Sequence, residues 1–281
     1  MKKLLILFFL CYSYNTLAQD DFELEFNKCV ELFHSENKSK ALKCLKKIEK
    51  EVDNNSSAYG KTLETIFYYY YKEYNEKEML VYYNKIVNSN LDDKEKNYRK
   101  DKPYSNYRFN VAKKLAYYFI EEKNDFEKGL TYIEKANSEF KYYTNSLASL
   151  VFQKINLAIW KYDVLNKLDR KADAISVILK RAFEYDYKNI YPELEVNSFS
   201  IYEKELFEKI YSQFPNPKEL KIEIDNQLSK LKYNNKKNLA HIKLFNNVIT
   251  IKTYKKLDNK EECINYLKNS SFYKDLEEKT K

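Results

Sequence analysis

Residues 115–136 read LAYYFIEEKNDFEKGLTYIEKA, and this stretch decides the expected fold. Apolar residues recur every three or four positions on both sides of Lys123-Asn124-Asp125, which predicts two helices joined by a short turn. We expect the helices over about Tyr107 to Glu122 and Phe126 to Phe140. Gly129 then falls inside the second helix, where glycine costs about 1 kcal/mol relative to alanine. A need for close helix packing explains its presence.

Breakers of regular structure are scarce along the whole chain. Its 281 residues include only two glycines and four prolines, against 28 tyrosines and 17 phenylalanines. A β-sandwich or barrel needs Gly, Pro, Asn or Asp at many tight turns, and a phosphate-binding loop needs clustered glycines. The composition therefore argues against these classes and favours a largely helical chain.

The same helix–turn–helix pattern recurs, which predicts about five to six antiparallel hairpins in an all-α, right-handed α-solenoid. Leu220 to Ile224 alternates like a strand, but Asn216-Pro217 before it is a favourable helix start, so we expect a helix there. The apolar faces of the successive pairs lie within residues 22–33 and 41–48, 58–74 and 76–88, 107–122 and 126–140, 145–167 and 171–185, 199–210 and 217–233, and 239–257 and 260–277. We expect turns at Tyr74-Asn75 in the second pair and at Leu168-Asp169-Arg170 in the fourth.

The second helices of four hairpins share a pattern of a small or slim residue, an aliphatic residue and a core pair. Residues 40–48 read KALKCLKKI, 78–86 EMLVYYNKI, 128–136 KGLTYIEKA and 262–268 ECINYLK. The pattern resembles the second helix of a tetratricopeptide repeat, and the likeness covers most of residues 22–278. Corresponding residues are spaced more widely than the family's repeat of about 34 residues, which long insertions or a HEAT-like packing would explain.

In tetratricopeptide proteins the first helix of each repeat lines a concave groove for peptides or partner proteins. The resemblance implies a groove lined here by Tyr68, Tyr71, Lys72, Lys113, Tyr117, Ile120 and Lys252. Aromatic and cationic side chains there favour an extended segment that carries carboxylates. The run Tyr68 to Tyr71 cannot face the core along its whole length, which fits a groove, although the bias of AT-rich codons also accounts for outward tyrosines.

The amino terminus has the three parts of a secretory signal. Met1-Lys2-Lys3 is positive, Leu4 to Leu10 is apolar but too short to span a bilayer, and Thr16-Leu17-Ala18 ends in a small residue. We expect residues 1–18 to be removed by cleavage after Ala18, a mature repeat domain over residues 19–281, and a secreted or periplasmic location. No later stretch is long enough to span a membrane.

Export places the remaining cysteines in a compartment that permits disulfides. Cys29 and Cys44 are equally far from the turn expected near Glu36-Asn37, so they can face each other. A bridge would stabilise the fold by about 3 kcal/mol in the chain-entropy model. Helix axes usually lie about 8–10 Å apart, however, and this distance favours two buried thiols instead.

Residue types that carry chemistry are sparse. His34 and His241 are the only histidines, and no HExxH, Cys/His cluster or Gly-x-Ser-x-Gly occurs. The net charge of +8 is small, and we interpret the basic runs Lys94 to Lys102 and Lys230 to Lys237 as solvated loops, not as a nucleic-acid stripe. We expect no metal and no other cofactor.

The expected function is that of an exported, non-enzymatic adaptor or binding module with a protein or peptide partner and no nucleic acid. The alternative is an envelope sensor or regulator, or a toxin–immunity component, that acts through a protein partner. An enzyme is the third choice.

Overall fold

The computed structural model describes residues 21–94, 104–184 and 200–281, except His34, Glu36, Asn246 and Tyr254 and the side chains of Leu147 and residues 200–202. The expected secretory signal lies outside the described residues. The chain divides into two compact units. The N-terminal unit is Met1–Lys114 with Phe140–Tyr143, and the C-terminal unit is Leu115–Glu139 with Thr144–Lys281.

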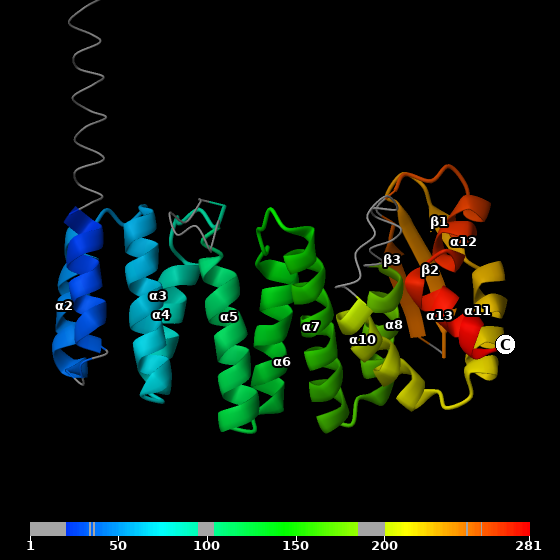
Figure 1. Ribbon diagram of the computed structural model, residues 1–281, viewed down its shortest axis with the longest axis horizontal. Helices are drawn as coiled ribbons and strands as arrows, with labels where there is room; N and C mark the ends of the chain where they lie inside the picture. The colour runs from blue at the N-terminus through cyan, green and yellow to red at the C-terminus, as the bar shows by residue number, and fades with distance from the viewer. Residues whose placement is uncertain are drawn as a thin grey trace, which may run out of the picture. The chain divides into compact units, whose positions relative to one another are not determined.

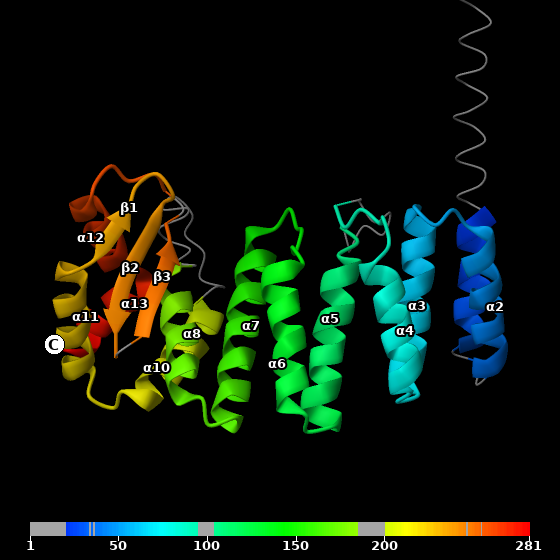
Figure 2. The ribbon, with the colours of Figure 1, turned by 180° about the vertical axis from the view of Figure 1, so that it is seen from behind.

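Helices form the N-terminal unit (Figures 1 and 2). They are a helix over residues 21–33, α2 (Lys38–Glu51), α3 (Ser57–Lys72), α4 (Glu76–Val87) and the first part of α5 (Tyr107–Tyr117). Side-chain caps begin two of them, because Tyr59 N donates to Ser56 Oγ at 3.1 Å and Glu78 N donates to Asn75 Oδ1 at 3.2 Å. Buried side chains between the helices include Phe26, Leu45, Leu63, Ile66, Phe67, Met79 and Phe109.

The turns predicted between helices at three positions are confirmed, and each contains a residue in the left-handed conformation. This residue is Tyr74 (φ 52°), Asn124 (φ 52°) or Asp169 (φ 56°). Glycine commonly takes this position at a helix C-terminus, because a Cβ is crowded there. The chain fills it with Asn, Asp and Tyr, so these turns form without any glycine.

The C-terminal unit combines helices with one small sheet. Its helical elements are η1 (Tyr118–Glu122), α6 (Phe126–Glu134), η2 (Lys135–Glu139), α7 (Leu147–Lys167), α8 (Lys171–Glu184), α10 (Ser200–Gln213), α11 (Pro217–Ser229), α12 (Lys260–Lys268) and α13 (Ser271–Lys279). The helix predicted after Asn216-Pro217 is confirmed. Lys218 N and Glu219 N donate to Asn216 Oδ1 at 3.1 and 3.5 Å, and α11 continues through Leu220 to Ile224.

The helix predicted over residues 239–257 is wrong, because this segment forms most of an antiparallel sheet. Strands β1 (Lys232–Asn234), β2 (Leu239–Leu244) and β3 (Asn247–Lys252) are ordered β1-β2-β3. Burial alternates along β2 and β3, with period two, and the run Val248-Ile249-Thr250-Ile251 in β3 is β-branched. Such residues pack well on a pleated surface and lose rotamer freedom in a helix. The chain is therefore mostly helical, as predicted, and it adds one small three-stranded sheet that was not predicted.

Both glycines lie where a neighbouring side chain leaves no room for a Cβ. A Cβ on Gly129 would collide with Ile120 Cγ1 and lie 3.0 Å from Ile120 Cδ1. This confirms the predicted packing role of Gly129. A Cβ on Gly60 would lie 2.5 Å from Cε2 of Tyr107. The start of α3 therefore packs closely against the start of α5, and Gly60 makes room for the Tyr107 ring.

Candidate protein-binding surface

α3 and α5 lie side by side and run in the same direction within the N-terminal unit. Asn110 Nδ2 donates to Glu64 Oε1 at 2.9 Å. One to two turns further along both helices, Lys114 Nζ lies 5.3 Å from the centroid of the Tyr71 ring, within cation–π range. Residue numbers rise together on the two helices, so side chains of α3 and α5 meet at more than one level along their length.

We call this the α3–α5 surface, and three of its residues were predicted from the sequence. Tyr68 and Tyr71 lie on α3 and Lys113 on α5, and all three are half-buried. Positions three or four apart share a helix face, so the surface also includes residues that the sequence analysis did not name. Its members are Glu64, Tyr68, Tyr71, Asn110, Lys113 and Lys114.

The electrostatics of the α3–α5 surface follow from burial. Burial raises the pKa of the Tyr68 hydroxyl well above its usual value, and the nearby Glu64 carboxylate raises it further. Burial also lowers the pKa of the Lys113 ammonium, and the adjacent Lys114 lowers it further. The charged form of Lys113 is therefore disfavoured here, and an anion placed beside it would restore part of its stability.

Two predicted lining residues, Lys72 and Tyr117, are accessible but contact other partners. Lys72 Nζ lies 5.4 Å from the centroid of the Phe33 ring, which belongs to the helix over residues 21–33. Tyr117 is 44% exposed and belongs to the C-terminal unit, where its ring centroid lies 6.3 Å from that of Trp160. The structure thus brings Tyr68, Tyr71 and Lys113 together and leaves these two in different surroundings.

Two other predicted residues do not line a groove formed by first helices. Ile120 is only 7% exposed, because its side chain fills the space that the missing Cβ of Gly129 leaves. Lys252 is exposed but ends strand β3, since the segment that carries it is not a helix. Its assignment to a helical groove is therefore wrong.

The four tyrosines from Tyr68 to Tyr71 point in different directions around α3, so only two of them reach the α3–α5 surface. Tyr70 is buried, and its ring centroid lies 5.7 Å from that of Tyr82 on α4. Tyr69 packs edge-on against Phe33 at 5.1 Å. Tyr68 and Tyr71 remain on the side of α5, as the helical period of 3.6 residues requires.

The sequence analysis missed Glu64, Asn110 and Lys114. A signal for each was present, because Glu64 precedes Tyr68 by four positions, and Asn110 precedes Lys113 by three and Lys114 by four. Such neighbours share a helix face with the residues that were chosen. The pairing of Glu64 with Asn110 could not be predicted, because it depends on the register between α3 and α5.

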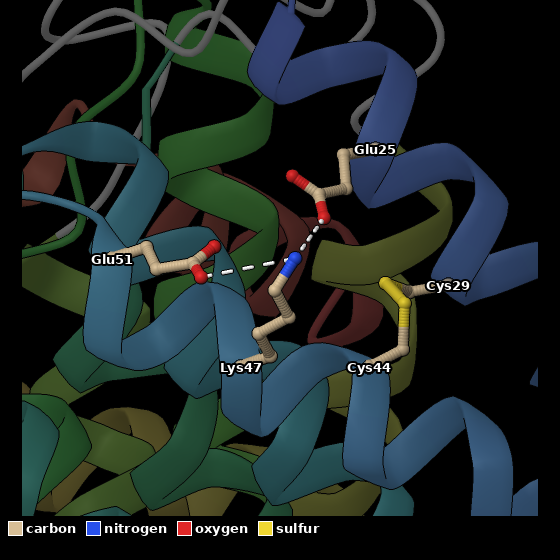
Figure 3. Close-up of a disulfide and its surroundings, with 5 residues drawn as sticks. All are labelled: Glu25, Cys29, Cys44, Lys47 and Glu51. Atoms are coloured by element: carbon tan, nitrogen blue, oxygen red, sulfur yellow. Dashed lines mark hydrogen bonds and ion pairs between the residues drawn. A yellow bond between two sulfur atoms is a disulfide. The ribbon is translucent and has the colours of Figure 1, made fainter.

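Cys29 and Cys44 form a disulfide between the helix over residues 21–33 and α2 (Figure 3). The preference for two buried thiols is therefore wrong. Their Cα atoms lie 5.5 Å apart, inside the usual disulfide range. The argument from axis distance failed because a Cα lies about 2.3 Å from its helix axis, which leaves only about 5 Å between facing Cα atoms when the axes are about 10 Å apart.

Lys47 forms two ion pairs near the disulfide. Lys47 Nζ lies 3.1 Å from Glu25 Oε1 on the first helix and 3.8 Å from Glu51 Oε1 on α2 (Figure 3). These side chains are about half exposed, so solvent screens both pairs and they contribute little to stability. The disulfide is thus a covalent link between these two helices, beside the buried side chains of Phe26 and Leu45.

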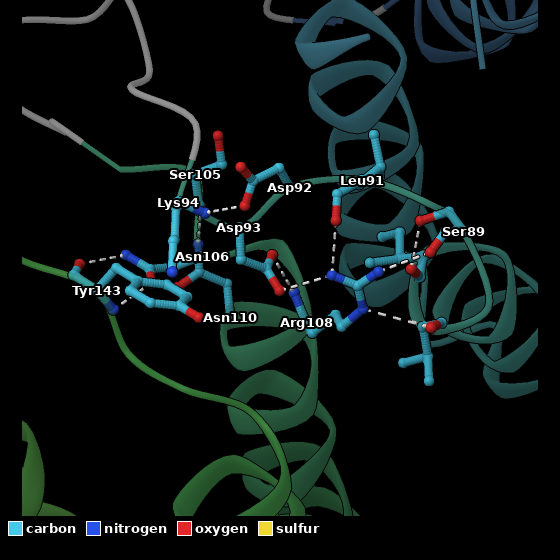
Figure 4. A network of polar contacts seen from close by, with 12 residues as sticks. Ser89, Leu91, Asp92, Asp93, Lys94, Ser105, Asn106, Arg108, Asn110 and Tyr143 are labelled. Atoms are coloured by element: carbon cyan, nitrogen blue, oxygen red, sulfur yellow. Dashed lines mark hydrogen bonds and ion pairs between the residues drawn. The ribbon is translucent and has the colours of Figure 1, made fainter. Parts of the chain in front are cut away.

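Arg108 fixes the start of α5 beside the end of α4 (Figure 4). Its guanidinium donates to three backbone carbonyls, from Nε to Val87 O at 3.3 Å, from Nη1 to Leu91 O at 2.9 Å and from Nη2 to Ser89 O at 2.6 Å. Nη1 also donates to Asp93 Oδ2 at 2.7 Å. A helix leaves its last carbonyl groups without partners within the helix. Here one arginine donates to the carbonyl of Val87, which ends α4, and to those of Ser89 and Leu91 just after it.

A second contact in the same network holds the segment before α5. Asn106 Nδ2 donates to Tyr143 O at 2.9 Å, and Tyr143 N donates back to Asn106 Oδ1 at 2.7 Å (Figure 4). Together with Arg108 these bonds set the position of α5, and so the position of Asn110, Lys113 and Lys114 relative to α3.

Other chemistry is sparse in the part of the chain that the structure describes. His241 Nδ1 lies 3.0 Å from Thr250 Oγ1 across two strands, whereas His34 is outside the described residues. No group of three or more His, Cys, Asp and Glu side chains there is placed to hold a metal ion. No described helix has both the length and the apolar character that a membrane crossing requires.

Comparison with models of protein families, with curated proteins and with solved structures gave no match for this chain.

Proposed function

We propose that the chain is an exported, non-catalytic helical-repeat protein of tetratricopeptide-like type that binds a protein or peptide partner on the α3–α5 surface. The observation that carries the proposal is the set of half-buried Tyr68, Tyr71 and Lys113 beside exposed Lys114 on two adjacent helices. Rigid tyrosine rings offer large contact area at low entropic cost, and the lysines favour a segment that carries carboxylates.

Features of the helices support a repeat architecture. Short turns with a left-handed residue at Tyr74, Asn124 and Asp169 join successive helices, and α3 and α5 run in the same direction. Helices that alternate in this way place every first helix on one side of a right-handed α-solenoid. Gly129 provides the close approach that a small residue gives within such a hairpin.

The proposal is tested by capture of partners with the double variant Tyr71→Ala, Lys113→Ala. The unaltered chain and the variant are used as baits on envelope and culture fractions of the source cells, and bound proteins are identified by mass spectrometry. We expect a partner that the unaltered chain retains and that the variant loses, with an affinity at least tenfold weaker by calorimetry once the partner is purified.

The matched control is Tyr74→Ala, Lys77→Ala, which removes the same residue types from exposed positions of the same unit outside the surface. Far-ultraviolet circular dichroism checks that both variants fold. Equal retention by all three baits, or equal loss in the control, contradicts binding on the α3–α5 surface.

A further inference from the structure

The positive charge of the chain is concentrated in one segment of the C-terminal unit. Residues 229–258 contain eight lysines, no arginine and a single acidic residue, Asp258. This segment therefore carries seven of the eight net positive charges, and the rest of the chain is nearly neutral. Codon bias raises the lysine content of a whole chain, so it does not explain why eight lysines here are accompanied by a single acidic residue.

The sheet formed by this segment has one buried and one solvent face. Ala240, Ile242 and Leu244 of β2 are buried, as are Ile249 and Ile251 of β3. Residues directly opposite each other in an antiparallel sheet lie on the same face. The pairs Lys232–His241, Leu239–Lys252 and Lys243–Val248 therefore lie together on the other face, where all three lysines are exposed.

Two loops add four more lysines at one end of the same sheet. The β1–β2 connection carries Lys236 and Lys237, and the segment after β3 carries Lys255 and Lys256. The loops lie together, because Thr253 N donates to Asn238 O at 2.9 Å and Asn235 Nδ2 donates to Asp258 O at 3.3 Å. All four loop lysines are exposed, next to Lys252 at the end of β3.

We call these residues the lysine face: Lys232, Lys236, Lys237, Lys243, Lys252, Lys255 and Lys256. Within the described residues, none of these seven ammonium groups forms an ion pair with a carboxylate. Like charges gathered on one face repel each other and weaken the fold. An anionic surface outside the molecule would offset that repulsion.

We propose that the lysine face docks the protein on an anionic phospholipid surface. Lysine presents a point charge on a flexible stem, which suits headgroups that move laterally, and each lysine near such a surface raises partitioning about fivefold. Nucleic-acid sites add rings that stack on bases and the planar fork of arginine. The segment has no arginine, Tyr233 lies on the buried side of the sheet, and Phe245 stacks on Phe214 at 4.3 Å.

The test is sedimentation with sucrose-loaded vesicles of phosphatidylcholine alone or with phosphatidylglycerol at 30 mol % as a roughly physiological anionic content. Every protein is expressed from the full sequence, and its N-terminus is read by mass spectrometry so that only chains with the same end are compared. The face variant changes Lys232, Lys236, Lys237 and Lys256 to Gln. The control changes Lys167, Lys171, Lys218 and Lys274 to Gln, which removes the same charge from exposed positions of the same unit.

We expect the unaltered chain and the control to bind anionic vesicles, to bind neutral ones far less, and to detach as salt rises toward about 0.5 M, because the Debye length then falls below about 5 Å. The face variant should partition roughly six hundredfold less, while its melting temperature stays the same or rises because repulsion between the lysines is relieved. Equal binding to both vesicle types, or an equal loss in face variant and control, overturns the proposal. Binding of a 20-nucleotide single strand or duplex without binding of vesicles also overturns it, in favour of nucleic acid.

Discussion

Because the chain has so little glycine, residues with a Cβ occupy left-handed backbone positions, and Tyr74 is one of them. Its φ of 52° lies in the left-handed region, where a residue with a Cβ is less stable than glycine by about 1–2 kcal/mol. The side chain is 60% exposed, so its removal loses little packing. We expect Tyr74→Gly to raise the free energy of unfolding by about 0.5–1 kcal/mol after the greater freedom of glycine in the unfolded chain is deducted.

Urea denaturation measures this change, and Tyr74→Ala is the control, because alanine removes the ring but keeps the Cβ. No gain is expected for the alanine variant. An equal gain for Gly and Ala would mean that the ring, and not the backbone conformation, is unfavourable.

Lys154 makes the stability of the C-terminal unit depend on alkaline pH. Burial lowers the pKa of its ammonium to about 8, with a further contribution from Arg181 that Glu184 partly opposes. The folded pKa lies below the unfolded value of about 10.4, so the unfolded chain binds more protons between pH 8 and about 10.4. The unfavourable contribution of Lys154 is therefore complete below pH 8 and fades as pH rises through this range.

Lys154→Met removes the charge and also the bond from Nζ to Asn137 O, which measures 3.2 Å. We expect the variant to be more stable than the unaltered chain by about 1 kcal/mol at pH 7, after solvent screening and the lost bond are allowed for. The gain should vanish by about pH 10. Urea curves at pH 7, 8.5 and 10 check this, and a difference that stays constant with pH contradicts the lowered pKa.

Among the elements, α11 is tied to α12 and α13 by a single carboxylate. Asp225 accepts bonds from Tyr273 Oη at 2.5 Å, Lys221 Nζ at 2.7 Å and Lys268 Nζ at 3.1 Å. Burial alone would raise the pKa of Asp225, but these bonds outweigh burial and lower it below its usual value. A depressed carboxyl pKa adds stability that is complete above about pH 4 and is lost as pH falls through the folded pKa.

We expect Asp225→Asn to destabilise the C-terminal unit by about 1–2 kcal/mol at pH 7, since an amide keeps an acceptor but loses the charge. The difference from the unaltered chain should shrink as the buffer is taken from pH 7 to pH 3. Glu278→Gln, at an exposed position of α13, serves as the control with no expected effect. A loss that is as large at pH 3 as at pH 7 would show that the charge of Asp225 is not responsible.

The elements that the sequence predicted well are those whose signal is local. Turns with Asn or Asp, the cap at Asn216 and helical spacing identified most helix pairs, because capping and amphipathic packing are encoded within a few residues. The sheet was not predicted, because residues 239–257 contain regularly spaced apolar residues, as an amphipathic helix does, and the alternation of Ala240, Ile242 and Leu244 is short. Period two, together with β-branched residues, was the deciding signal.

On the scale of the whole molecule, the candidate site was predictable only within one element at a time. The spacing of residues along one helix predicts that Tyr68 and Tyr71 share a face. Lys113 was predicted separately, from its position on the helix expected over residues 107–122. Lys252 was misplaced because the architecture changes from helical hairpins to a sheet before it. The disulfide between Cys29 and Cys44 depends on how two helices face each other. The positions of the two cysteines in the sequence allow them to meet, but do not determine whether they do.

The disulfide also tests whether the two compact units open separately. It closes a loop of 15 residues inside the N-terminal unit, and its removal by Cys29→Ser, Cys44→Ser should cost about 3 kcal/mol in the chain-entropy model. Contacts of the C-terminal unit are unaltered. We therefore expect faster hydrogen exchange over residues 21–33 and α2 and unchanged exchange in β2 and β3, because each cooperative unit opens with its own free energy.

Reduction of the unaltered chain with a phosphine should reproduce this pattern, which separates loss of the bridge from any effect of the two serines. Exchange that rises equally in α2 and in β2 and β3 would mean that both units open in one cooperative step. Exchange that rises in neither would mean that Lys47, Glu25 and the packing of Phe26 hold the first helices together without the bridge.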